Sequence, residues 1–287
     1  MKNTFKTALL LTVLTLFLVL VGQVIGGRQG MLIALVFALG INFVSYWFSD
    51  KIVLAMYRAK PVTEEEAPDL VRTVRHLAQL NDMPMPKVYL IPTEAPNAFA
   101  TGRSPKHAAV AATEGILRIL SQEELEGVLA HELAHVRNRD VLVATVAAAI
   151  AGAIYYLIDM ARWSMMFGGR RDSRDRSGGA VQLVAFLVIS IVAPLVAMLI
   201  QMAISRSREY QADDSGARLC RKPLALASAL EKIHAMAARR PMEQANPATA
   251  HLFIVNPLTG RQLMNLFSTH PPVERRVEIL HNLAKQL

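Results

Sequence analysis

Residues 121–140 read SQEELEGVLAHELAHVRNRD, and the rest of the chain can be interpreted outward from this stretch. Ser121 and Glu124 form the S-x-x-E capping signature found at the start of many helices. Apolar residues then recur at helical spacing, at Leu125, Val128, Leu129, Leu133 and Val136. The stretch therefore predicts a helix that carries the sequence HELAH on residues 131–135.

The HELAH motif has the residue types and the spacing of a zinc site. His131 and His135 are four residues apart, so they project from one helix face about 5–6 Å apart and can reach one metal ion. Glu132 lies beside them, where it can take a proton from a metal-activated water and pass it to the amine of a cleaved peptide bond. With 8 histidines in 287 residues, a chance HExxH match has a probability of about one per cent. The alternative is an ordinary exposed helix that happens to carry these residues.

The sequence on both sides of this helix is apolar enough for a membrane protein. Hydrophobic residues make up 53% of the chain and the mean hydropathy is +0.30, above the usual balance of soluble proteins. Four stretches approach the roughly 20 residues that cross a bilayer: Ala8–Ile25, Met31–Phe48, Val141–Trp163 and Val181–Ile204. We expect the first to remain uncleaved, because no small-x-small cleavage site follows it. The third and fourth, which carry Asp159 and Pro194, could instead form a buried helical hairpin.

The basic residues beside these stretches predict the topology. Five lie on one side: Arg28, Arg170, Arg171, Arg174 and Arg176. Nine lie on the other side, with the HELAH motif: Lys2, Lys6, Lys51, Arg58, Lys60, Arg137, Arg139, Arg206 and Arg208. We therefore expect a multi-pass protein of the cytoplasmic (inner) membrane, with both termini and the active site in the cytoplasm. The predicted parts are two transmembrane helices in residues 1–48, a first peptidase segment in 49–140, a transmembrane hairpin in 141–204 and a second peptidase segment in 205–287.

The two cytoplasmic segments are expected to form one domain. The fold class is thus an α-helical membrane protein with four transmembrane helices and a cytoplasmic α+β zincin-like peptidase domain. In the first segment the residue pattern predicts a helix over 69–80 and a turn over 81–86. Three short strands are predicted at 87–91, 97–101 and 107–113, and we interpret them as a small meander.

A catalytic zinc needs a third protein ligand and an open fourth position. The metzincin continuation would require Gly at 138 and His at 141, and the chain has Asn138 and Val141. An antiparallel pair of spans would instead return Glu209 to the membrane face where the histidines lie. Asp213, at i+4 from Glu209, could accept the free ring N–H of His131 or His135. The alternatives are a surface Glu209 paired with a neighbouring arginine and a solvated Asp213.

The charge pattern and the number of cysteines argue against nucleic-acid binding and against disulfide or thiolate metal sites. The formal charge of +8 would suit nucleic acid, but no basic stripe with interleaved aromatic residues is present, and basic loops are expected in an inner-membrane protein. We therefore expect no nucleic-acid partner. Cys220 is the single cysteine, so neither an intrachain disulfide nor a thiolate metal cluster can form.

Several motifs in order give the chain a wider resemblance. With HELAH stand NAFATG at 97–102, SRSREYQADD at 205–214 and STHPPVERRVEIL at 268–280. The chain closely resembles the HtpX-type membrane metallopeptidases, relatives of the CAAX prenyl proteases, over essentially its whole length. The resemblance implies gluzincin chemistry with one Zn²⁺ per chain, held by His131, His135 and Glu209. It also implies endopeptidase action on misfolded or damaged membrane proteins, in stress-related quality control.

Two further motifs are carried over by this resemblance. Asn97 and Phe99 match the NAFA strand of the family, which is expected to be an edge strand that pairs with an extended substrate; Phe99 could instead be a core residue. His270 and Arg276 match a C-terminal H-P…R pattern that approaches the metal, where a cation could stabilise the oxyanion of the transition state. His270 could equally cap the helix that begins near Pro272.

Other functions remain to be weighed against this one. A membrane-anchored adaptor could keep the zinc fold for peptide binding, although it would not need Glu132. An exopeptidase would need a group that holds a chain terminus, and no motif supplies one. A prenyl-protein protease is closer in chemistry, but four spans are few for the membrane chamber that this relationship implies. The remaining histidines are expected at the surface or in the core, without a second metal: His76, His107, His234, His251 and His281. No pattern indicates an oligomeric state.

Overall fold

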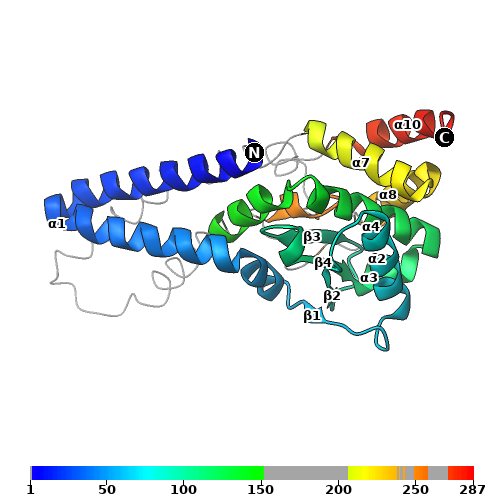
Figure 1. Ribbon diagram of the computed structural model, residues 1–287, viewed down its shortest axis with the longest axis horizontal. Helices are drawn as coiled ribbons and strands as arrows, with labels where there is room; N and C mark the ends of the chain where they lie inside the picture. Colours follow the sequence, from blue (N-terminus) through cyan, green and yellow to red (C-terminus); the bar gives the residue numbers. More distant parts are fainter. Residues whose placement is uncertain (1, 152–205, 238, 240–241, 243–248, 258–270) are drawn as a thin grey trace.

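The computed structural model describes residues 2–151, 206–237, 239, 242, 249–257 and 271–287. A long two-armed helix extends from a body in which helices cover a small sheet (Figure 1). In chain order the body contains β1 (Lys60–Pro61), α2 (Pro68–Leu80), β2 (Lys87–Ile91), β3 (Ala98–Gly102), a 3-10 turn (Pro105–His107), β4 (Ala108–Thr113), α3 (Glu114–Ile119), α4 (Gln122–Arg137), α7 (Arg206–Cys220), α8 (Pro223–Ala237), a second 3-10 turn (Ala250–Leu252) and α10 (Val273–Ala284).

The helix α1 (Lys2–Met56) contains the first two predicted spans. Its two arms meet at Gly26 and Gly27, where Gly27 has φ of 57°, a conformation that costs glycine little. The second arm, Gly26–Met56, is 31 residues long. Its most apolar 18-residue window has a mean hydropathy of 2.0, and only 11% of that window is buried. By length and composition it can cross a membrane. It also continues past Phe48, where the sequence predicted the end of the N-terminal membrane part.

The other predicted spans are described less completely. The apolar part of the first arm, Thr7–Leu20, is shorter than a full span, and residues Val141–Ala151 form the described beginning of the third. The rest of the third span and all of the fourth lie outside the described residues. The count of four spans therefore stays a prediction.

The sheet has the strand order β1-β2-β4-β3. β2 and β4 are parallel, whereas β1 with β2 and β3 with β4 are antiparallel. Strands β2, β3 and β4 fall where the sequence predicted them, to within a residue. The predicted meander is wrong, because β3 does not pair with β2. All six residues of β4 are buried, and an edge position would leave one row of its buried backbone N–H and C=O groups unpaired. β4 therefore lies between β2 and β3, and β3 forms the edge.

The helix α4 is the centre of the body and contacts α2, α7, α8 and β3. The predicted capping box at its start is confirmed: the Ser121 hydroxyl accepts the Glu124 N–H, and the Glu124 carboxylate accepts the Ser121 N–H at 2.8 Å. Leu129 and Leu133 are fully buried in the main hydrophobic core. The contacts with α2, α7, α8 and β3 thus hold in place the helix that carries HELAH.

The helix α7 approaches α4 closely through Gly216. A Cβ at this position would lie 2.8 Å from the backbone nitrogen of His131, closer than such atoms pack in proteins. The absence of a side chain at Gly216 thus lets α7 lie directly against the HELAH turn of α4. This contact sets the distance between the acidic residues of α7 and the histidines.

Candidate active site

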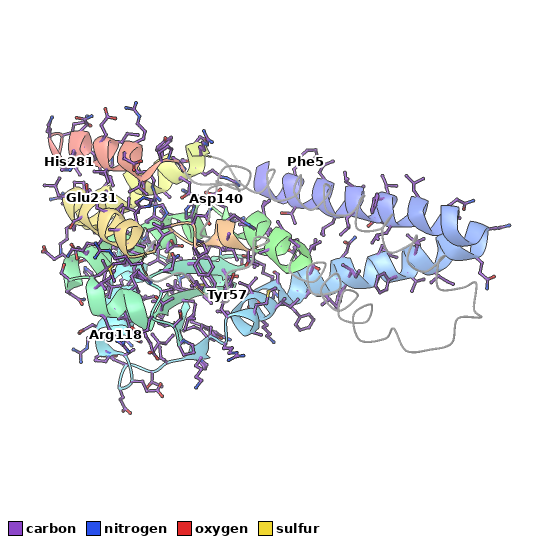
Figure 2. All side chains as sticks on the ribbon, turned by 180° about the vertical axis from the view of Figure 1, so that it is seen from behind. Phe5, Tyr57, Arg118, Asp140, Glu231 and His281 are labelled. Atoms are coloured by element: carbon purple, nitrogen blue, oxygen red, sulfur yellow. The ribbon has the colours of Figure 1, made fainter. Side chains whose placement is uncertain are left out.

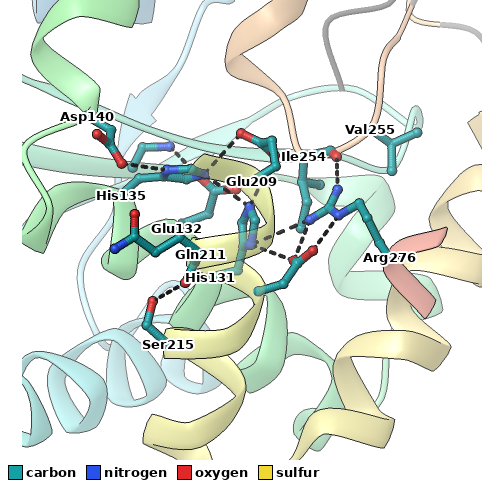
Figure 3. A network of polar contacts seen from close by, with 12 residues as sticks. His131, Glu132, His135, Asp140, Glu209, Gln211, Ser215, Ile254, Val255 and Arg276 are labelled. Carbon is teal, nitrogen blue, oxygen red and sulfur yellow. Dashed lines mark hydrogen bonds and ion pairs between the residues drawn. The ribbon is translucent and has the colours of Figure 1, made fainter. Parts of the chain in front are cut away.

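The structure brings His131, His135 and Glu209 together (Figure 3). The Nε2 atoms of the two histidines are 3.2 Å apart. The Glu209 carboxylate comes from α7, with Oε2 at 3.7 Å from Nε2 of His131 and Oε1 at 3.4 Å from Nε2 of His135. The topological argument had predicted this return of Glu209 to the histidines.

These separations suit a zinc ion. Zinc bonds of about 2.0–2.2 Å at tetrahedral angles hold ligand atoms about 3.3–3.6 Å apart, and the three observed distances span 3.2–3.7 Å. Two imidazoles and one carboxylate are also the donor set of a catalytic zinc site with an open fourth position. His131, His135 and Glu209 are therefore the residues that would hold the metal.

His131 is fixed by a buried chain of charges. Its Nδ1 lies 2.9 Å from Oδ1 of Asp213, and Arg276 of α10 binds the same carboxylate through Nε at 2.8 Å and Nη2 at 2.7 Å. Burial opposes ionisation, but the Arg276 charge prevails and lowers the pKa of Asp213 to about 2. An ionised Asp213 accepts the Nδ1–H of His131, so that Nε2 carries the lone pair toward the metal position.

Arg276 is itself fully buried. Its remaining nitrogen, Nη1, donates to the carbonyl of Ile254 at 3.0 Å. Nε, Nη1 and Nη2 thus all contact protein acceptors, which favours a positioning role through Asp213. The resemblance had suggested direct contact with the transition state. His270, its predicted companion, lies outside the described residues.

His135 has a second acidic neighbour that the sequence analysis did not select. Its Nδ1 is 3.6 Å from Oδ2 of Asp140, and Arg208 lies 3.9 Å from the other oxygen of that carboxylate. Arg139 has φ of 57°, so the chain turns back at the end of α4, and the N–H of Asp140 bonds the carbonyl of His135 at 3.0 Å. The only sequence signal was an aspartate five residues after the second histidine.

Glu132 is buried beside the cluster and contacts the edge strand. Its Oε2 accepts the backbone N–H of Ala100 in β3 at 2.9 Å. Burial raises the pKa of Glu132 to about 8, with the nearby His135 and Ala100 opposing the shift. A carboxyl group that titrates near neutral pH is suited to exchange protons with a reacting group.

A cavity of about 50 Å³ adjoins these residues. It is lined by Glu132, Ala100 and the metal cluster on one side and by residues 251–254 on the other. His251 is buried there, with Nε2 at 3.1 Å from the carbonyl of Ala144. The sequence analysis treated His251 as one surface or core histidine among several, because no motif spacing connects it with the HELAH histidines.

Asn97 and Phe99 do not line this cavity in the structure. Asn97 donates from Nδ2 to the carbonyl of Val255 at 2.8 Å and so fastens β3 to residues 252–255. Phe99 is fully buried. The centre of its ring lies 5.2 Å from the centre of the Phe253 ring and 6.0 Å from that of the Tyr57 ring. Of the two interpretations of Phe99, the structure supports the core residue.

An HExxH helix whose histidines face a glutamate from a second helix defines a metallopeptidase of the gluzincin class. The sequence places it further: the model of Peptidase family M48 matches residues 64–284. The chain belongs to this family of zinc metallopeptidases. With the long apolar arm of α1, this makes it a membrane-associated metalloprotease.

Similar proteins support the same family. A protease HtpX homolog of Thermodesulfovibrio yellowstonii is 58% identical over 284 residues, covering 99% of both chains. One from Syntrophobacter fumaroxidans is 55% identical, covering 99% of this chain and all of its own. One from Pyrococcus furiosus is 55% identical, covering 98% and 96%. The crystal structure of S. mikatae Ste24p shares the fold, with a TM-score of 0.53 at 15% identity, and the match covers 97% of this chain but 65% of that one.

Proposed function

We propose that the chain is a zinc-dependent endopeptidase at the cytoplasmic face of the membrane, which cleaves misfolded or damaged membrane proteins in stress-related quality control. The observation that carries the proposal is the position of Glu132 between the ligand cluster and the edge strand β3. Bound zinc would supply Lewis-acid chemistry, because it lowers the pKa of water toward about 7 and polarises a carbonyl oxygen.

Glu132 is the general base in this proposal. The Ala100 N–H holds Oε2, which leaves Oε1 to take the proton from the attacking water. Glu132 then delivers this proton to the nitrogen of the scissile bond, so that the amine can leave. Its burial supports this role, because a desolvated carboxylate binds a proton more readily than one in water.

The substrate is proposed to lie extended along β3. Asn97 pairs with Thr113 of the neighbouring chain segment, and backbone groups alternate between the two sides of a strand. Ala98 and Ala100 therefore face the outer edge. The carbonyl of Ala98 already accepts the Ile254 N–H at 3.2 Å, so substrate pairing is expected toward the Ala100 end of β3.

The test of the chemistry compares the full chain in detergent with its Glu132→Gln variant. Metal is removed with a chelator, zinc is returned, and cleavage of a loosely folded protein is followed. The variant keeps the side-chain size and the three ligands, so it should bind one zinc while its rate falls at least about 100-fold. Glu123→Gln, an exposed residue in the first turn of the same helix, is the matched control and should remain fully active.

Equal rates for the wild type and Glu132→Gln would assign the base to another residue. A variant that has lost its zinc would instead make Glu132 part of the metal site. Both outcomes are read from the zinc content measured beside the rate.

The test of the substrate class uses the full chain in a lipid bilayer. One unfolded segment is offered twice, once free in solution and once tethered to the same bilayer by a transmembrane helix. The tethered form should be cleaved faster, because the tether raises its effective concentration at the site. Equal rates would contradict the membrane-substrate proposal without affecting the role of Glu132.

The orientation in the membrane has its own test. A tag after Leu287 should be accessible to an added protease from the cytoplasmic side alone.

A further inference from the structure

A second and larger cavity lies outside the catalytic centre. Its volume is about 600 Å³, and it lies between the second arm of α1 and the residues around β2 and β4. Trp47, Phe48 and Lys51 line it from α1, and Lys87, Arg103 and Lys106 line it from the body. It shares no lining residue with the cavity beside the HELAH histidines.

The lining of this cavity is positively charged. Four cations, Lys51, Lys87, Arg103 and Lys106, face one carboxylate, Asp50. Among the residues that the structure describes, none of these four cations forms an ion pair with a carboxylate. The arginines of α2 differ, since Arg72 and Arg75 both bind Glu64. The charge of the cavity is thus available to an anion from outside.

Aromatic side chains hold part of this charge in place. The guanidinium of Arg103 lies 4.4 Å from the centre of the Trp47 ring, and its Nη1 is 3.4 Å from the carbonyl of Trp47. The ammonium of Lys51 lies 5.3 Å from the centre of the Phe48 ring. Such contacts orient a cation without neutralising its charge. Trp47 and Phe48 are 44% and 41% exposed, so the same rings can also meet a partner.

The position of the cavity along α1 matches the depth of lipid headgroups. No charged residue lies between Arg28 and Asp50. From Arg28 to Trp47 a helix rises about 28 Å, close to the roughly 30 Å of a hydrocarbon core. Exposed apolar side chains cover this length, including Ile33, Val36 and Phe37, and Figure 2 shows the side chains of both arms projecting outward from the ribbon. Tryptophan and basic residues are typical of the level where the phosphates begin.

We propose that this cavity binds the phosphate-bearing headgroup of an anionic membrane lipid, from the leaflet that adjoins the peptidase body. Arg103, Lys87 and Lys106 bind the phosphate, and the acyl chains lie along the apolar face of α1 beside Trp47. Basic pockets at the end of a membrane helix bind anionic headgroups in this way, and the volume is within the range of small-molecule sites. The proposal needs a membrane at α1 and does not depend on the catalytic role of Glu132.

The test measures lipid binding to the full chain in a mild detergent. Phosphatidylglycerol, phosphatidylcholine and inorganic phosphate are titrated separately, and bound lipid is counted by native mass spectrometry while thermal unfolding is followed. Phosphatidylglycerol should bind and raise the melting temperature, whereas phosphatidylcholine and inorganic phosphate should do so weakly. The double variant Arg103→Gln with Lys106→Gln should bind phosphatidylglycerol roughly 30-fold more weakly.

Two further variants complete the design. Arg72→Gln with Arg75→Gln removes the same charge from α2 and should bind as the wild type does. Lys87→Gln leaves the Arg103 contact with Trp47 intact and should still weaken binding, which separates lost charge from a disturbed fold. Equal binding by the double variant and the α2 control would overturn the proposal. Equal affinity of the wild type for the two lipids, or a full response to inorganic phosphate alone, would also overturn it. The same holds if the double variant changes its oligomeric state but still binds the lipid.

Discussion

The two histidines of the HELAH motif are supported in different ways. His131 lies on a fully buried chain of Asp213 and Arg276, with each contact at 2.7–2.9 Å. The His135 side chain is 14% exposed, and the contacts of its chain are longer: its Nδ1 is 3.6 Å from Asp140, and Arg208 is 3.9 Å from the other oxygen of that carboxylate. Short buried contacts define one geometry, whereas longer and more exposed ones allow adjustment. The site therefore has a rigid side at His131 and an adjustable side at His135.

The largest effect is expected at the rigid side. Replacing Arg276 by Met leaves Asp213 buried without its cation, which costs about 3–5 kcal/mol of stability. The melting temperature and the zinc content of the purified variant should both fall. Arg275→Gln, in which the neighbouring exposed arginine loses a surface ion pair with Glu278, is the control and should change little. If Arg276→Met melts with the control, the rigid side is not held by this charge.

Gly216 tests whether the close contact of α7 and α4 sets the ligand distances. In Gly216→Ala the new methyl group meets the backbone at His131, and α7 must move away at a cost of up to about 3 kcal/mol. Zinc affinity should fall with stability, because Glu209 moves with α7. Gly40→Ala, whose Cβ meets nothing within 4 Å, is the matched control. A stable Gly216→Ala protein with weakened zinc binding would still support the argument, but one with unchanged zinc affinity would not.

Acid should affect the rigid side through Asp213. Its folded pKa is about 2 against a usual value of 3.8, so the ionised form is stabilised by folding. This contribution is present above about pH 5 and is lost as the pH falls from about 4 to 2, and it amounts to about 2 kcal/mol. Unfolding followed at several pH values in metal-free protein should show a flatter dependence in this window for Asp213→Asn. Parallel curves for the two proteins would contradict the shift.

The smallest effect is expected at the adjustable side. Asp140→Asn keeps the shape but removes the charge that orients His135, and zinc affinity should fall about tenfold. Asp213→Asn should reduce the affinity more, because its partner Arg276 has no other carboxylate in the described contacts. Competition with a zinc chelator measures both variants. Equal losses, or a larger one for Asp140→Asn, would reverse the comparison.

The sequence predicted those parts of the fold that depend on local patterns. The capping box of α4, the bounds of α2 and the positions of the strands follow from short-range periodicity and turn residues. The strand order could not be derived in this way, because it depends on which strand has a hydrogen-bonded neighbour on each side, and this is decided by the tertiary structure. The wrong meander came from assuming that neighbours in sequence pair in space, although the fully buried β4 needed two partners.

The site shows the same division. His131, Glu132 and His135 are near one another in sequence, and Glu209 could be placed with them because the predicted pair of spans would return the chain to the same membrane face. Asp140 and His251 are near the site only through the φ of Arg139 and the path of residues 251–254. Arg276 was selected through a motif, but its contacts with Asp213 and Ile254 depend on the docking of α10. Such contacts have no periodic signal in the sequence.

The place of Arg276 on α10, which follows α4 and α7 in the sequence, has a consequence for synthesis. During translation the histidines and Glu209 emerge from the ribosome before α10 does. Until α10 is made and docked, Asp213 lacks its cation and cannot hold His131 in one orientation. The orientation of His131 is therefore fixed only after α10 has been made and has docked on Asp213, later than the synthesis of the three residues that would hold the metal.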